Sequence, residues 1–424
     1  MTELKHVEGE LTGSRYKSGV SFKYTISIPQ VDVAEFALLV EHDGPNNGNI
    51  RSMLALADEG KAPYCISIGV MPGVLTMADG STRDMRMNCY DVFDREYADF
   101  LVYELLPSIL DDYGLKISSS PDMHMISGGS SGGLSAFRVA WFHPEYFHRV
   151  HMSSPSFLAM GRGNELPYLI RKCETKPLRI SQEMSETEPN DYFGWSRGID
   201  EEADKGLSFA GYDIRTAYFA GEGHCSRYGD YEAAYCRNEW LWQDWATTPI
   251  VAHANSPRVD KVVPFGTGWE KCDTFPYKNM PTLPATLAVC DCASASCDGL
   301  AYYAGNKNED AVYLHAADAN GSVKPALLHA ALHTVPRIEP KGAIALATDA
   351  CERLYVLTAI GIQCVRSYGL IDVILDLPDG SVPADIAITD ALYVKTEEGV
   401  YKRPLCANCT DFQNPCRKYV CYFD

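Results

Sequence analysis

Apolar runs bounded by turn residues predict a series of strands in the first half of the chain. Residues 36–41 and 64–70 are almost continuously apolar, as in strands buried on both faces of a parallel sheet. Shorter runs predict further strands at residues 17–30 (two short strands), 123–126, 147–152, 178–181 and 214–219.

Helical periodicity separates these predicted strands. Residues 94–112 place apolar side chains on one face, and further helices are predicted up to residue 142 and over residues 231–245. Strands that alternate with helices indicate an open, mostly parallel α/β sheet.

The pattern changes after residue 248, where helical periodicity ends and short β runs follow between turns. Regular spacing of this kind favours an all-β module. We therefore expect four regions: an α/β domain at 1–248, a proline-containing connector at 249–283, a β domain at 284–405 and a cysteine-rich tail at 406–424.

The amino-acid composition limits the kinds of molecule that this chain is expected to bind. Hydrophobic residues make up 46% of the 424 residues, so a sizeable core can form. The formal net charge is −19, which disfavours binding to nucleic acid and to anionic membranes. The N-terminus lacks an apolar leader segment, so we expect a cytoplasmic protein, or a secreted one if a leader has been removed.

The 15 cysteines do not resemble a secreted disulfide framework, because their number is odd and no leader is visible. Four of them lie in the tail and could bind zinc, form local disulfides or remain free thiols: Cys406, Cys409, Cys416 and Cys421.

A Gly-x-Ser-x-Gly pattern lies between a predicted strand and a predicted helix, in the segment Gly128–Gly133. There it is typical of a nucleophile elbow, whose tight turn lifts a serine above the sheet edge. Two registers fit, one centred on Ser130 and one on Ser131. The alternative interpretation is a phosphate-binding turn at a helix N-terminus.

A serine nucleophile needs a histidine base and an acid, which follow it in the order serine, acid, histidine in this kind of fold. His224 fits best, because it lies in a loop shortly after the strand predicted at 214–219. The acid is expected in the loop after residues 178–181, and the residues alone do not select among Glu186, Glu188 and Asp191.

Residues 9–246 resemble the esterase-D and enterochelin-esterase-like branch of the α/β-hydrolases, which includes feruloyl and acetylxylan esterases. The matching segments are residues 40–44, 86–91, 97–101, 104–107, 126–134, 140–147 and 221–224. The family pattern Gly-x-Ser-x-Gly-Gly selects Ser130 as the nucleophile. The family's Gly-x-x-Asp turn favours Glu188 as the acid, with Asp191 and Glu186 as alternatives, and Cys89 stands where relatives often carry Glu.

The same resemblance implies an oxyanion hole and a substrate-binding surface. The backbone N–H of Ser131 would be one donor, and that of Gly44 the other. We expect Arg86, Asp43 and Trp195 to contact the substrate, and no metal or cofactor to take part.

The C-terminal region resembles the last blades of a gluconolactonase- or regucalcin-type β-propeller. The matching parts are Asp349 and residues 353–363, 377–380 and 400–405. There is room for about three blades, whereas a six-bladed propeller needs about 250 residues. Lys341-Gly342 stands where that family has an Asp-Gly with a metal-binding Asp, so we expect no lactonase metal site. The open edges of a partial propeller would need cover, either by packing on the α/β domain or by pairing with a second copy of the chain.

The favoured hypothesis is a serine esterase that forms an acyl-enzyme on an acetyl- or feruloyl-type carbohydrate ester. The main alternative is an inactive binding or scaffold protein derived from a hydrolase. A siderophore esterase and a sugar lactonase are further alternatives, and the net charge of −19 disfavours an anionic ferric siderophore. The expected partners are a small-molecule or oligosaccharide ester and a second copy of the chain, with no nucleic acid and no membrane.

Overall fold

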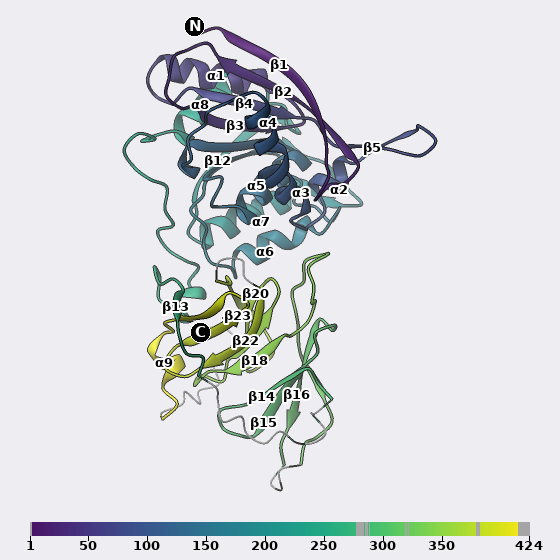
Figure 1. Cartoon of the computed structure of the whole chain (residues 1–424), viewed down its shortest axis with the longest axis vertical. Helices are drawn as coiled ribbons and strands as arrows, with labels where there is room; N and C mark the ends of the chain where they lie inside the picture. Colours follow the sequence, from purple (N-terminus) through teal and green to yellow (C-terminus); the bar gives the residue numbers. More distant parts are fainter. Residues whose placement is uncertain are drawn as a thin grey trace. The chain divides into compact units, whose positions relative to one another are not determined.

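A computed structural model describes residues 2–276, 284, 287, 289–318, 320, 322–378 and 382–413 (Figure 1). The chain divides into two compact units. The first runs from the N-terminus to His253 without Lys172–Glu174, and the second contains Lys172–Glu174 and the residues from Ala254 onward. In the part of the chain that the structure describes, no helix is long and apolar enough to cross a membrane.

Six neighbouring parallel strands form the centre of the first unit. Their order in the sheet is β12 (Asp213–Gly223), β9 (Arg179–Thr187), β8 (Arg149–Ser153), β7 (His124–Gly129), β3 (Ala37–His42) and β4 (Cys65–Val70). Every residue of β3, β7 and β8 is buried. For β3 this agrees with the continuous apolar run in the sequence, whereas β8 also buries the polar residues Arg149, His151 and Ser153. Because all six strands run the same way, their C-terminal ends lie along one edge of the sheet.

Four antiparallel strands extend this sheet to ten. β2 (Val20–Pro29) pairs with β4, and the others are β1 (Leu4–Thr12), β5 (Val74–Thr76) and β6 (Thr82–Asp84). The prediction of two short strands within residues 17–30 is wrong. That segment forms the single strand β2, and its partner β1 lies in a polar segment whose side chains are mostly exposed.

Helices cover the parallel sheet. α1 (Asn47–Asp58) and α8 (Tyr231–Leu241) share one apolar cluster with Ala37 and Leu39 of β3. The alternate residues of β3 point to the opposite face and are also fully buried. α5 (Ser131–Phe142) packs on β7 and β8, and α7 (Ser196–Phe209) on β9 and β12. This arrangement is an α/β-hydrolase-like fold.

The remaining helices of the first unit are short. The helix predicted over residues 94–112 is present as α3 (Glu96–Phe100), a π-helical turn η1 (Leu101–Leu105) and α4 (Leu106–Asp112). The others are α2 (Arg86–Tyr90), α6 (Leu166–Ile170) and the 3-10 turns η2 (Pro121–Met123) and η3 (Gly163–Glu165).

The second unit consists of three four-stranded antiparallel sheets. The first contains β14 (Cys292–Ala295), β15 (Ala301–Gly305), β16 (Ala311–Ala316) and β17 (Leu327–Ala331). The second contains β18 (Ala345–Thr348), β19 (Leu354–Thr358), β20 (Gly361–Val365) and β21 (Ile371–Leu375). The third contains β22 (Pro383–Ile388), β23 (Leu392–Thr396), β24 (Gly399–Arg403) and β13 (Glu270–Cys272). These small sheets do not by themselves confirm the propeller suggested by the resemblance.

Part of the segment expected to be a connector belongs to the core of the second unit. Val259, Val262 and Val263, in and after the 3-10 turn η4 (Val259–Lys261), are fully buried in its apolar cluster. β13 adds an outer strand to the third sheet.

The beginning of the cysteine-rich tail packs on this unit. In and beside α9 (Ala407–Thr410), the thiols of Cys406 and Cys409 lie 3.3 Å and 3.9 Å from the carbonyl oxygens of Asp260 and Lys261. Cys416 and Cys421 lie outside the described residues. Among the described residues, no group of three or more histidine, cysteine or acidic side chains is placed to hold a metal ion.

Candidate active site

The Gly-x-Ser-x-Gly segment forms a tight turn between β7 and α5. Ser130 occupies the turn itself with φ 56° and ψ −129°, whereas Ser131 is the first helical residue and is buried. A Cβ atom at Gly128 would lie only 2.1 Å from the Gly132 carbonyl oxygen, so this turn requires glycine there. A non-glycine residue held at positive φ after a strand is the geometry of a nucleophile elbow.

His224 and Glu188 meet at the same sheet edge. Glu188 directly follows β9 and His224 directly follows β12, and these strands are parallel neighbours. His224 Nδ1 lies 2.5 Å from Glu188 Oε2. The Glu188 side chain is fully buried, while 31% of the His224 side chain is exposed, which suits a base that must reach a substrate.

The other two candidate acids have different partners. Glu186 Oε2 accepts a hydrogen bond from the Gly221 N–H at 2.5 Å. Asp191 accepts one from the Phe193 N–H at 2.8 Å within the small hairpin of β10 (Asn190–Asp191) and β11 (Gly194–Trp195). Both residues are exposed. The geometry therefore brings Glu188, and neither alternative, to the histidine.

Contacts around Cys225 join the histidine loop to the elbow. The Cys225 thiol lies 3.3 Å from the Ser153 carbonyl oxygen, which also accepts the Ser130 N–H at 2.9 Å. A Cβ atom built on Gly129 would lie 3.2 Å from the same thiol. The Ser130 hydroxyl itself lies 3.1 Å from the Ser156 hydroxyl.

The electrostatics of the pair favour a charged acid beside a basic imidazole. Burial alone would raise the pKa of Glu188, but hydrogen bonds from His224 and Ser154 outweigh it and lower that pKa. A hydrogen bond to the Cys225 side chain, followed by the contact with Glu188, raises the pKa of His224 above its ordinary value.

Asp200 of α7 is a further buried carboxyl in this region that sequence reasoning missed. Its side-chain oxygens have no hydrogen-bond partner among the described residues. Burial, and next the charge of Glu188, raise the pKa of Asp200 well above its ordinary value. In the sequence Asp200 looks like any other acidic residue of a helix, so nothing there indicates that its carboxyl is buried.

The loop after β3 lies against the first turn of α5. A Cβ atom at Gly132 would be 2.9 Å from Asp43 Oδ2, and Asp43 itself has φ 63°. The Gly44 N–H donates to the Val70 carbonyl oxygen at 3.1 Å, so the expected role of Gly44 as oxyanion donor conflicts with this bond. The Asp43 N–H faces the Tyr90 hydroxyl at 3.4 Å, a long and therefore weak contact.

The expected substrate-binding residues occupy different parts of the first unit. Arg86 makes a two-pronged ion pair with Asp43, with both N–O distances 2.8 Å. Trp195 lies in the β10–β11 hairpin with 53% of its surface exposed, and nearby Tyr192 is 89% exposed. Cys89 is buried, and its carbonyl oxygen accepts a hydrogen bond from Arg138 at 2.5 Å.

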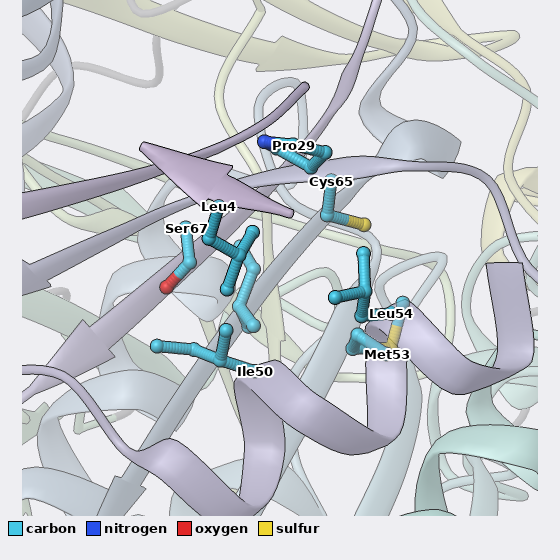
Figure 2. A pocket seen from close by; sticks show the side chains of 8 residues that line it. Leu4, Pro29, Ile50, Met53, Leu54, Cys65 and Ser67 are labelled. Carbon is cyan, nitrogen blue, oxygen red and sulfur yellow. The ribbon is translucent and has the colours of Figure 1, made fainter. Parts of the chain in front are cut away.

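A small apolar cavity lies elsewhere in the first unit (Figure 2). It is lined by Leu4, Pro29, Leu39, Ile50, Met53, Leu54, Cys65 and Ser67. None of these residues belongs to the elbow, to the acid loop or to the histidine loop, so the cavity is separate from the candidate site.

Comparison with known proteins agrees with the expected class of enzyme. Residues 30–201, less than half of the chain, match the family model described as putative esterase. This match supports a carboxylic ester hydrolase. A search of curated proteins found no match.

Several esterases are among the solved structures that are similar to this chain. A ferulic acid esterase is 16% identical with a TM-score of 0.44, and the match covers 57% of this chain and 98% of that one. An enterobactin esterase from Shigella flexneri is 20% identical with a TM-score of 0.41, covering 57% of this chain and 60% of that one. A siderophore hydrolase from Aspergillus nidulans is 16% identical with a TM-score of 0.39, and the match covers 58% of this chain and 96% of that one. These three matches are similarities, and they do not assign the activity of any of these proteins to this chain.

Proposed function

We propose that the chain is a serine carboxylic-ester hydrolase that works through Ser130, His224 and Glu188. The observation that carries this proposal is the 2.5 Å contact of His224 Nδ1 with Glu188, at the sheet edge where Ser130 occupies a strained turn. A nucleophile, a base and a buried acid that follow parallel strands of one sheet form the arrangement that acyl transfer requires.

In the proposed mechanism, Ser130 Oγ attacks the acyl carbon of the ester while His224 Nε2 takes the hydroxyl proton. The Glu188 carboxylate accepts the Nδ1–H of His224, holds that tautomer and stabilises the imidazolium. The imidazolium then gives its proton to the leaving alcohol, and an acyl-Ser130 ester remains. His224 then takes a proton from a water molecule, which attacks the acyl carbon and releases the carboxylic acid, and the imidazolium returns that proton to Ser130 Oγ.

The proposed oxyanion hole consists of the backbone N–H groups of Ser131 and Asp43. The Ser131 N–H begins α5, where the helix dipole also favours negative charge. Asp43 replaces Gly44 in this role because the Gly44 N–H is engaged with Val70. The weak contact of the Asp43 N–H with Tyr90 could be exchanged for the oxyanion, and each such donor contributes about 3 kcal/mol at the transition state.

The Ser130 hydroxyl must turn from Ser156 toward the imidazole before it can react. Rotation about the Cα–Cβ bond moves a serine hydroxyl between staggered positions at low cost. Hydrogen bonds of catalytic groups commonly tighten only when substrate is bound.

We propose an acetyl- or feruloyl-type carbohydrate ester as the substrate. Tyr192 and Trp195 support this class, because they expose aromatic faces on the hairpin that begins two residues after Glu188. Flat aromatic faces bind sugar rings and aromatic acyl groups through their apolar surfaces. The net charge of −19 disfavours a strongly anionic siderophore complex.

The test compares wild type, Ser130→Ala and Ser131→Ala on chromogenic acetyl and feruloyl esters. We expect Ser130→Ala to lose about a thousandfold or more of kcat, while Ser131→Ala retains most of it because its backbone N–H is unchanged. Equal inactivity of all three proteins on every ester would contradict the proposed function. A loss of activity confined to Ser131→Ala would identify Ser131, and not Ser130, as the nucleophile.

A further inference from the structure

The loop that follows β8 touches the surroundings of each member of the proposed triad. Ser153 at the end of β8 and the loop residues Ser154–Ser156 lie between the elbow on one side and the acid and histidine loops on the other, because β8 is the sheet neighbour of both β7 and β9. Sequence reasoning assigned this serine-rich segment no role.

Ser154 connects the acid to the histidine loop. Its hydroxyl donates to Glu188 Oε1 at 2.5 Å and accepts the Cys225 N–H at 3.1 Å. The other carboxylate oxygen of Glu188 is the one that faces His224. The one hydroxyl thus contacts the acid and the residue next to the base.

The backbone of Ser154 is held in an unfavourable conformation to make these contacts. Its φ is 42°, a region that residues with a Cβ atom rarely adopt, and only 1% of its surface is exposed. Its N–H donates to the Glu183 carbonyl oxygen at 2.8 Å, which anchors the loop to β9. Strain of this kind is unfavourable and points to a functional constraint.

Glu188 has one further donor, which defines its position. The Ser185 N–H lies 3.1 Å from the same Oε1 that receives the Ser154 hydroxyl. Two donors on Oε1 leave Oε2 free to accept from the imidazole, so the carboxylate cannot rotate without breaking both bonds.

We infer that Ser154 is a positioning residue of the triad, which orients the Glu188 carboxylate and ties the histidine loop to it through one hydroxyl group. This inference rests on the proposed function. It adds to the three expected residues a fourth whose side chain touches neither substrate nor nucleophile and acts through Glu188.

The test uses the full chain with Ser154→Ala and Ser154→Gly. Glycine adopts a φ of 42° without strain, so Ser154→Gly removes the hydroxyl while keeping the loop in a favourable conformation. The matched control is Ser181→Ala, a buried serine on β9 whose hydroxyl has no hydrogen-bond partner among the described residues. Active sites are counted in every protein by covalent labelling of Ser130 with a fluorophosphonate.

We expect kcat per labelled site on a chromogenic acetyl ester to fall about 10- to 100-fold in both Ser154 variants, with KM changed by less than about twofold. The acid limb of kcat/KM, which reports the pKa of His224, should move to lower pH, because a carboxylate that Ser154 no longer orients raises that pKa less. Ser181→Ala should match wild type in both measurements.

The outcomes separate the two proposals. Wild type that is inert and unlabelled at Ser130 overturns the proposed function, and this inference with it. An active wild type with kcat and acid limb unchanged in Ser154→Gly overturns the positioning role alone. If Ser154→Ala is inactive but Ser154→Gly is fully active, the alanine acts through backbone strain, and the inference is also overturned.

Discussion

Both units of the chain bury charged groups, but only the first also contains the proposed triad. The second unit buries the ion pair of Arg366 with Asp372 and the carboxyl of Asp349. The core of the second unit is an apolar cluster of mainly Val, Leu and Ile side chains. The first unit also buries charged groups, including the ion pair of Arg237 with Glu183 at 3.1 Å and the carboxyl of Glu41. Burial raises the pKa of Glu41 to about 7 and lowers that of His42 to about 4, which shows how costly charge is at these positions.

Several residues of the first unit with a strained backbone lie along one edge of its sheet. Five neighbouring parallel strands each end just before a residue of the candidate site: Asp43 after β3, Ser130 after β7, Ser154 after β8, Glu188 after β9 and His224 after β12. Asp43, Ser130 and Ser154 have positive φ, as does Cys225 next to the histidine. Buried charge and positive φ occur in the second unit as well, at Asp349 and Glu352 for example. What distinguishes the first unit is that several strained residues gather at one sheet edge, where the proposed chemistry requires fixed polar groups.

The largest expected effect is the loss of kcat when His224 of the first unit is replaced. A histidine of the second unit is the control. His224→Gln should lower kcat for ester hydrolysis about a thousandfold or more, because no group remains to take the Ser130 proton. His329→Gln changes a half-buried histidine of the second unit and should leave kcat unchanged. Steady-state kinetics on one chromogenic ester compares them, and a similar loss in both variants would break the contrast between the units.

A smaller but still large loss is expected at the acid. Glu188→Gln should lower kcat about a hundredfold or more, since an amide neither holds the required tautomer nor stabilises the imidazolium. Glu186→Gln and Asp191→Asn should stay within about twofold of wild type, as both residues are exposed and have other partners. If Asp191→Asn is the variant that loses activity, the acid has been misassigned.

The pH dependence of the reaction should report the environment of His224. Only the neutral imidazole can accept a proton, and a raised pKa keeps the imidazole protonated to higher pH. We therefore expect kcat/KM to increase with pH along a limb whose midpoint lies above the ordinary histidine value of about 6.5. Glu188→Gln should shift this midpoint downward. A wild-type midpoint at or below the ordinary value would contradict the electrostatic picture.

The smallest effect on activity is expected from the apolar core of the second unit. Leu357→Ala truncates a fully buried side chain and should lower the free energy of unfolding of that unit by about 2–5 kcal/mol. Activity per folded molecule should not change, because no residue of the proposed triad lies in this unit. Urea unfolding together with kinetics measures both quantities, and a parallel loss of kcat would show that the second unit contributes to the reaction.

Much of the first unit could be predicted from the sequence because its signals are local. Continuous apolar runs predicted β3 and β4, and the glycine spacing predicted the turn at Ser130. β9 was predicted to end at residue 181 but continues to Thr187, since its last residues are polar and carry no apolar pattern. Because the predicted strand ended too early, the residues alone did not select the acid. In the structure β9 ends at Thr187, which places Glu188 directly at the sheet edge.

The sequence alone predicted the α/β class of the first unit, most of its central strands and the turn at Ser130, and it pointed to His224 as the candidate base, because each of these rests on neighbouring residues. Contacts of the folded chain, in contrast, bring Glu188 to the histidine, engage the Gly44 N–H and let Ser154 link two loops. These are contacts between residues far apart in the chain. They depend on which strands are neighbours in the sheet and where each one ends, and no local periodicity encodes that.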